Sequence, residues 1–155
     1  MEDQWSITDG AVTIRPPIDG DRERLIAGRD PEFHRFLGNG SDDPSPTGCV
    51  VVDGEVVGWV DHDSYREWLE PGEVNLGYNV FASARGTGCG TRAVKLLLHH
   101  LALTGSATVA TLLIHPDNAR SLALAERAGF VRHGDLDGNP YWKQPVPPRS
   151  TDPHP

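Results

Sequence analysis

The chain has 155 residues, of which 37% are hydrophobic and 23% are charged, and its formal net charge at pH 7 is −8. This length and composition predict one soluble globular domain that is large enough for a core of its own. The acidic balance argues against nucleic acid as a partner, and the absence of an apolar run of about 18 residues argues against a membrane span.

The first part of the chain predicts a short strand, two helices and a long loop. Pro16-Pro17 ends a β-branched run, and Asp19 or Asp21 can cap the helix that follows. Gly28 suits the end of that helix, and Pro31 suits the first turn of the next one. The predicted elements are a frayed entry over 1–10, a strand over 12–15, helices over 22–27 and 32–37, and a loop over 38–48.

Asp53-Gly54 lies between two apolar, β-branched runs and predicts a β-hairpin of residues 49–52 and 55–60. The acidic and imidazole side chains of 61–63 follow the hairpin. Adjacent residues of a strand point to opposite faces, so we expect no metal site there. A loop is predicted over 64–72.

The predicted strand over 73–81 has two faces of different chemistry. One face is apolar and predicts core packing; it carries Val74, Leu76, Tyr78 and Val80. The other face is more polar; it carries Glu73, Asn75, Gly77, Asn79 and Phe81. The polar face directly precedes a glycine-rich segment, and we therefore expect the chemistry of the protein on that face.

The segment Arg85-Gly86-Thr87-Gly88-Cys89-Gly90 lies between this strand and a Leu-rich helical pattern. A strand, a glycine loop and a helix start together direct backbone N–H groups and a helix dipole at an anion. Neither common nucleotide motif fits, because the first lysine is Lys95 and position 91 is a threonine. A phosphate cradle and a tight turn with nothing bound both remain open at this point.

The last part of the chain predicts two more helices and three strands. The strand, glycine loop, helix and next strand of residues 73–114 predict one parallel βαβ unit. Asp117 or Asn118 can cap a helix that Gly129 ends, and Asp137-Gly138 predicts a second hairpin. We expect a single domain over 1–144 and a disordered, proline-rich tail over 145–155. The predicted elements are helices over 91–103 and 119–128, and strands over 107–114, 130–133 and 141–143.

Two of these segments together resemble the GNAT N-acetyltransferases. Arg85-x-x-Gly88-x-Gly90 is similar to the family's signature for the acetyl-CoA diphosphate, and the helix from Asn118 to Gly129-Phe130 is similar to its second motif. The likeness is strongest over 73–135 and nearest to the branch that acetylates N-terminal amines of ribosomal proteins. It implies an α+β fold, the GNAT fold, with a mixed, mostly antiparallel sheet flanked by helices and one parallel, cofactor-binding βαβ unit.

The resemblance implies an N-acetyltransferase that moves an acetyl group from acetyl-CoA to a primary amine, either a protein N-terminus or a small amine, by direct attack on the thioester. The alternative is a CoA-binding sensor or interaction module without turnover. The family also implies a cleft for the pantetheine arm beside the strand over 73–81. By the same resemblance, the cofactor-binding residues are Phe81, Arg85, Gly86, Thr87, Gly88, Cys89, Gly90, Thr91 and Asn118.

For catalysis, Glu73 is the expected base, with a burial-tuned pKa, and Asn75 could orient a water instead. Many family members carry a tyrosine where this chain has Ala125, which leaves the hydroxyl of Ser121 as the group within reach of the leaving thiolate. The resemblance also places the two early helices at the acceptor site, which makes Phe33, His34 and Phe36 candidates there.

We expect acetyl-CoA as co-substrate, a small or peptide amine as acceptor, and no metal, nucleic acid or membrane partner. Two cysteines, Cys49 and Cys89, and a polar N-terminus favour the cytoplasm. We expect no nucleophilic role for Cys89. A homodimer is one option for the oligomeric state, which the sequence leaves open.

Overall fold

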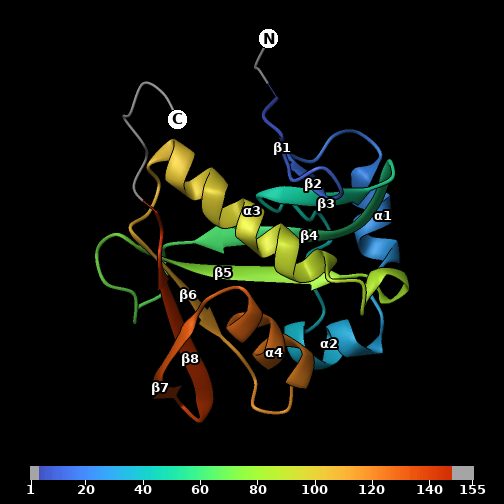
Figure 1. Ribbon diagram of the computed structural model, residues 1–155. Coiled ribbons are helices and arrows are strands. Elements are labelled where there is room, and N and C mark those ends of the chain that lie inside the picture. Colours follow the sequence, from blue (N-terminus) through green and yellow to red (C-terminus); the bar gives the residue numbers. More distant parts are fainter. Residues whose placement is uncertain (1–3, 148–155) are drawn as a thin grey trace, which may run out of the picture.

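One eight-stranded sheet, in the order β1-β2-β3-β4-β5-β6-β8-β7, runs through the protein (Figure 1). The structure is a computed structural model and describes residues 4–147. Every neighbouring pair is antiparallel except β5 and β6, which are parallel and joined by α3. The strands are β1 Ile7–Thr8, β2 Thr13–Arg15, β3 Gly48–Val52, β4 Glu55–Asp63, β5 Glu73–Val80, β6 Val109–Leu113, β7 Val131–Leu136 and β8 Asn139–Pro145.

Helices cover both faces of the sheet, and the buried side chains accordingly form two clusters. The larger cluster joins α3 and α4 to one face through residues such as Leu97, Leu101 and Leu124. The smaller one joins α1 to the opposite face through Leu25 and Cys49. The helices are α1 Asp21–Ala27, α2 Pro31–Leu37, α3 Cys89–Thr104 and α4 Ala119–Arg127, with a 3-10 turn at Ala82–Ala84.

Local sequence explains most of these boundaries. Asp53 and Gly54 both have positive φ, 51° and 79°, which is what the two central residues of the tight β3–β4 turn require. Asp30 caps α2 by accepting a hydrogen bond from the Phe33 N–H at 3.0 Å, and Pro31 occupies the first turn. The predicted α+β class, the parallel βαβ unit and the element order from the strand at 13–15 onward are confirmed.

Three expectations need correction. The entry over 1–10 contains a strand, because Ile7 and Thr8 pair with β2. Asp21 does not cap α1: it is fully buried and accepts a hydrogen bond from Arg15 at 2.7 Å, while Gly20 takes the cap position. The domain also extends past 144, since β8 reaches residue 145 and Val146 is buried. Residues 148–155 lie outside the described residues, so disorder there stays a prediction.

The parallel strands β5 and β6 pair only at their beginnings. The register joins Glu73 to Val109, Val74 to Ala110 and Asn75 to Thr111. Beyond these pairs β5 continues to Val80 and β6 to Leu113 without pairing with each other. The sheet therefore opens between the two strands, and the glycine loop and the start of α4 lie beside this opening.

Candidate active site

A cavity of about 890 Å³ occupies the opening between β5 and β6. Its walls come from β5 beyond Asn75, the glycine loop, the end of β6, the first turns of α4, and α2. The cavity thus reaches from the α3 and α4 face of the sheet to the face that carries α2. One substrate can enter at the glycine loop while another approaches from α2.

The glycine loop presents bare backbone to this cavity. Gly86 and Gly88 have φ of 79° and 85°, and a Cβ on either would meet no atom within 4 Å. Gly88 is also the N-cap of α3 and makes no side-chain cap, so the first N–H groups of the helix face outward unpaired by the helix itself. At Gly90 a Cβ would come within 3.1 Å of Val80 and 3.2 Å of Leu124. The loop therefore has the open, donor-rich shape that a diphosphate fits.

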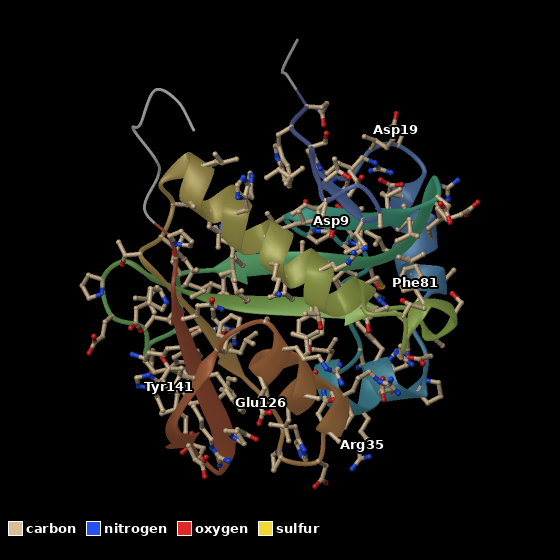
Figure 2. All side chains as sticks on the ribbon, viewed as in Figure 1. Asp9, Asp19, Arg35, Phe81, Glu126 and Tyr141 are labelled. Carbon is tan, nitrogen blue, oxygen red and sulfur yellow. The ribbon has the colours of Figure 1, made fainter. Side chains whose placement is uncertain are left out.

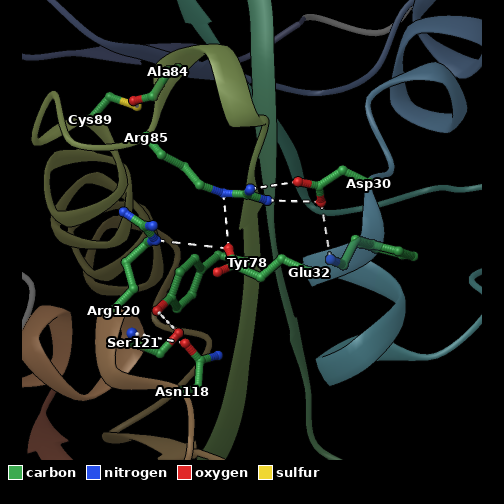
Figure 3. A network of polar contacts seen from close by, with 10 residues as sticks. Asp30, Glu32, Tyr78, Ala84, Arg85, Cys89, Asn118, Arg120 and Ser121 are labelled. Atoms are coloured by element: carbon green, nitrogen blue, oxygen red, sulfur yellow. Dashed lines mark hydrogen bonds and ion pairs between the residues drawn. The ribbon is translucent and has the colours of Figure 1, made fainter.

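Not every predicted cofactor residue turns its side chain toward the cavity. Arg85, Gly86, Gly88, Gly90, Thr91 and Asn118 line it. The Thr87 hydroxyl instead donates to the Ala84 carbonyl at 2.6 Å. The Cys89 thiol approaches the same carbonyl at 3.6 Å (Figure 3). Phe81 lies at the end of β5 near α1, where its ring covers Gly28 (Figure 2). Thr87 and Cys89 can act through their backbone, whereas Phe81 packs against the smaller buried cluster at α1.

Arg85 braces the loop against α2. Its guanidinium makes two hydrogen bonds to the carboxylate of Asp30, at 2.5 and 3.0 Å, and its Nε lies 3.0 Å from the carboxylate of Glu32 (Figure 3). The hydrogen bond from Arg85 lowers the pKa of Asp30 from 3.8 to about 2. A cation held by two carboxylates has little charge left for a ligand, so the loop's own anion-binding capacity resides in its main chain.

A second polar group joins β5 to α4. The Tyr78 hydroxyl donates to the Ser121 Oγ at 2.6 Å, and the Ser121 N–H donates to the Asn118 Oδ1 at 3.2 Å (Figure 3). Asn118 is thus the N-cap of α4, as predicted. Burial raises the pKa of Tyr78 to about 12. Sequence reasoning placed Tyr78 in the core; a polar tip on an otherwise apolar strand face was the only signal that it has a partner.

Glu73, the expected base, lies outside the cavity at the start of β5. Its carboxylate accepts hydrogen bonds from Lys143 Nζ at 2.8 Å and from the Glu70 N–H at 3.2 Å. Burial alone would raise the pKa of Glu73, but these bonds and the charge of Lys143 lower it below the ordinary value. This contradicts the expected tuning toward neutrality. Asn75 does line the cavity, and its Oδ1 accepts a hydrogen bond from Thr111 at 3.2 Å.

Aromatic side chains line the α2 end of the cavity. Phe33 and Phe36 contribute from α2, as expected for an acceptor site, whereas the exposed His34 turns back to the Gly38 carbonyl at 2.9 Å. Arg66 and Trp68 reach the cavity from the loop over 64–72, and the sequence carried no motif that predicted them.

Over 4–147, no group of three or more His, Cys, Asp or Glu side chains is placed to hold a metal ion. Within the same range, no helix combines the length and the apolar character that crossing a membrane would need.

Residues 39–131 match the family model described as the acetyltransferase (GNAT) domain. The chain belongs to the GNAT acetyltransferase family. No curated protein sequence matches it. As a GNAT enzyme it is an acyl-CoA-dependent N-acetyltransferase, and acetyl-CoA is its co-substrate.

Solved structures share the fold of this GNAT enzyme at low sequence identity. A GNAT-family acetyltransferase from Bacillus anthracis is 14% identical, with a TM-score of 0.76 over 92% of this chain and 99% of that one. The ribosomal alpha-N-protein acetyltransferase RimL with coenzyme A is 15% identical, with a TM-score of 0.73 over 93% of this chain and 98% of that one. The aminoglycoside acetyltransferase AAC(6')-Ib with coenzyme A is 22% identical, with a TM-score of 0.72 over 87% of this chain and 95% of that one.

Proposed function

We propose that this enzyme acetylates the single primary amine of an acceptor that carries no further positive charge. The acceptor class that we propose is the α-amine of a peptide. The cavity's charges support this proposal. Glu32 is the one carboxylate among the lining residues of the described chain, and its carboxylate already lies 3.0 Å from Arg85 and 3.8 Å from Arg120. A polycation such as an aminoglycoside needs several unpaired carboxylates, because burying unpaired charges is costly.

The aromatic residues at the α2 end support the same acceptor class. Phe33, Phe36 and Trp68 offer apolar area beside the opening, and Asn75 offers an amide. Aromatic surface with a few placed polar groups is typical of sites that bind small or peptide ligands. The similar structures differ in this respect: one structure of AAC(6')-Ib contains paromomycin, and RimL is a ribosomal alpha-N-protein acetyltransferase.

We assign the diphosphate of acetyl-CoA to the backbone N–H groups of 86–91. The pantetheine arm then lies in the opening between β5 and β6, where the strand backbone can pair with it as a further strand would. Asn118 lines the cavity at the start of α4 and contacts the co-substrate in this arrangement. The two free cysteines are buried, which is consistent with the proposed cytoplasmic location.

Acetyl-CoA supplies an activated thioester, so the protein mainly positions two substrates. The amine nitrogen attacks the carbonyl carbon, a C–N bond forms and the C–S bond breaks. Asn75 is placed to hold a water that takes the amine proton. Its Oδ1 accepts a hydrogen bond from Thr111, which leaves its N–H groups to donate to one lone pair of that water, while the second lone pair takes the amine proton. The hydroxyl of Ser121 faces the departing sulfur.

The acceptor class can be tested by thiol release from acetyl-CoA. We expect fast release with a short peptide that has a free N-terminus, and only the slow release to water with the same peptide acetylated at its N-terminus. Kanamycin and spermidine test the polycation alternative. Faster release with either than with the peptide would overturn the acceptor class, and CoA binding without release for any amine would favour a binding module.

A further inference from the structure

Tyr78 and Ser121 face each other across the opening of the sheet. Tyr78 belongs to β5 and Ser121 to the first turn of α4, and both line the cavity. Their hydroxyl oxygens are 2.6 Å apart, with Tyr78 as the donor. This is the short distance of a strong O–H···O hydrogen bond, and it joins the two walls between which the pantetheine arm would lie.

The bond keeps the proton of Ser121 from pointing at Tyr78, because it takes one of the two acceptor positions of the Oγ. Tyr78 occupies an acceptor position of the Oγ, and the backbone N–H of Ser121 is engaged with Asn118. Within residues 4–147, no other side-chain hydrogen bond involves this hydroxyl. A hydroxyl has one O–H donor, which rotates to suit its surroundings. Because Ser121 lines the cavity, a group bound there can accept this proton.

We propose that Tyr78 is a positioning residue for acetyl transfer, which orients the hydroxyl of Ser121 so that its proton faces the thioester sulfur. The inference rests on the proposed placement of Ser121 beside that sulfur. As the amine nitrogen bonds to the carbonyl carbon and the C–S bond breaks, the sulfur keeps the electron pair. The Ser121 O–H then donates to the developing thiolate. The amine proton goes to water, and Tyr78 keeps its own proton.

The surroundings of Ser121 favour a role as an oriented hydrogen-bond donor rather than as a general acid. With a pKa of about 12, Tyr78 stays protonated over the range of about pH 6 to 9 in which such assays run, so it donates to Ser121 throughout. One turn further along α4, Ala125 is fully buried and offers only a methyl group. A donor already aimed at the developing charge needs no reorganisation during the reaction.

Single-turnover acetyl transfer to the free-amine peptide, and thiol release to water without any amine, can measure the effect. We expect Ser121→Ala to slow both about ten- to a hundredfold, the range for losing a hydrogen bond to a charged group. Tyr78→Phe should slow both about five- to tenfold, because the Ser121 hydroxyl then loses its fixed orientation but keeps its proton. The Kd for acetyl-CoA should stay within about twofold in both variants.

The double variant separates positioning from packing. If Tyr78 acts through Ser121, Tyr78→Phe has no further effect in the Ser121→Ala background. Tyr141→Phe is the matched control: Tyr141 is also buried but is not among the residues that line the cavity, so the loss of its hydroxyl should leave the rates unchanged.

The outcomes distinguish the two proposals. Unchanged rates in Ser121→Ala would refute the placement of Ser121 and with it the role of Tyr78. A slow Ser121→Ala beside an unchanged Tyr78→Phe would refute the role of Tyr78 alone. Losses that simply add in the double variant would also refute it, since they would mean that Tyr78 acts independently of Ser121.

Discussion

Replacing Asp30 by asparagine tests whether the ion pair to Arg85 braces the glycine loop. Asparagine keeps an oxygen that can cap α2 at the Phe33 N–H, so the change removes mainly the charge. Both partners are largely covered, with 23% of the Asp30 side chain and 12% of the Arg85 side chain exposed. Solvent therefore screens this pair less than it screens an ordinary surface pair.

The size of the effect follows from the pKa of Asp30. The pKa falls from 3.8 to about 2 in the folded protein. At about 1.4 kcal/mol per pH unit, this difference corresponds to about 2 kcal/mol of folding free energy. A carboxyl whose pKa is lower in the folded state stabilises the fold at pH values above its unfolded-state pKa. It loses that contribution as the pH falls through its folded-state pKa. The contribution of Asp30 is therefore complete above about pH 4 and disappears toward pH 2.

Urea unfolding of the wild type and Asp30→Asn at several pH values would measure this contribution. We expect the free energy of unfolding of the variant to be about 2 kcal/mol lower than that of the wild type at pH 7, and this difference to shrink between about pH 4 and 2. Asp43→Asn is the control, because its side chain is 87% exposed and lies 3.9 Å from its arginine partner; its unfolding curve should match the wild type. A difference that does not change with pH would refute the electrostatic argument.

The same variant decides what Arg85 does for the co-substrate. If Arg85 braces the loop, Asp30→Asn should weaken CoA binding several-fold, because the loop must then be ordered at the moment of binding. Tighter binding would mean that the freed guanidinium contacts the diphosphate, and the bracing role would be wrong. Isothermal titration with CoA at pH 7 would distinguish the two.

Three further predictions concern the loop, the expected base Glu73 and the domain boundary. Gly88→Ala and Gly105→Ala both force an alanine to positive φ and should each cost about 1–2 kcal/mol in urea unfolding, but only Gly88→Ala should also weaken CoA binding in a titration, by at least tenfold. Glu73→Gln should lower stability, by an amount that fades as the pH falls below the ordinary pKa of the carboxyl, yet leave the transfer rate within about twofold; a hundredfold loss would instead support Glu73 as the base. A chain ending at 147 should unfold like the full chain, whereas one ending at 144 should lose about 2 kcal/mol with the buried side chain of Val146.

Local patterns were sufficient to predict the elements that carry the fold. Alternation along 73–80, the apolar stripe of α3 and the asparagine cap of α4 each depend on residues that are neighbours in sequence, and the structure has all three. The Asp53-Gly54 turn belongs to the same class, because its geometry depends on two adjacent residues. The two-residue strand β1 was missed because it is held by pairing with β2 and carries almost no pattern of its own.

The chemistry of individual side chains was predicted less well, since it depends on partners far away in the chain. Alternation put Glu73 on the polar face of β5 correctly, but gave no sign that Lys143, 70 residues later, would neutralise it. The partner of Arg85 is 55 residues earlier, at the start of α2. Tyr78 was assigned to the core because its face is apolar, and only the separation of β5 from β6 lets its hydroxyl reach Ser121.

These distant partners change how the site is expected to bind its co-substrate. The arginine of the glycine motif is satisfied by Asp30 and Glu32, so the diphosphate meets oriented N–H groups at a helix start before it meets a side-chain cation of the loop. Oriented backbone donors cost no side-chain entropy on binding, because the fold has already ordered them. We therefore expect the ion pairs to contribute to affinity indirectly, by holding the loop in a shape in which its backbone N–H groups can bind an anion.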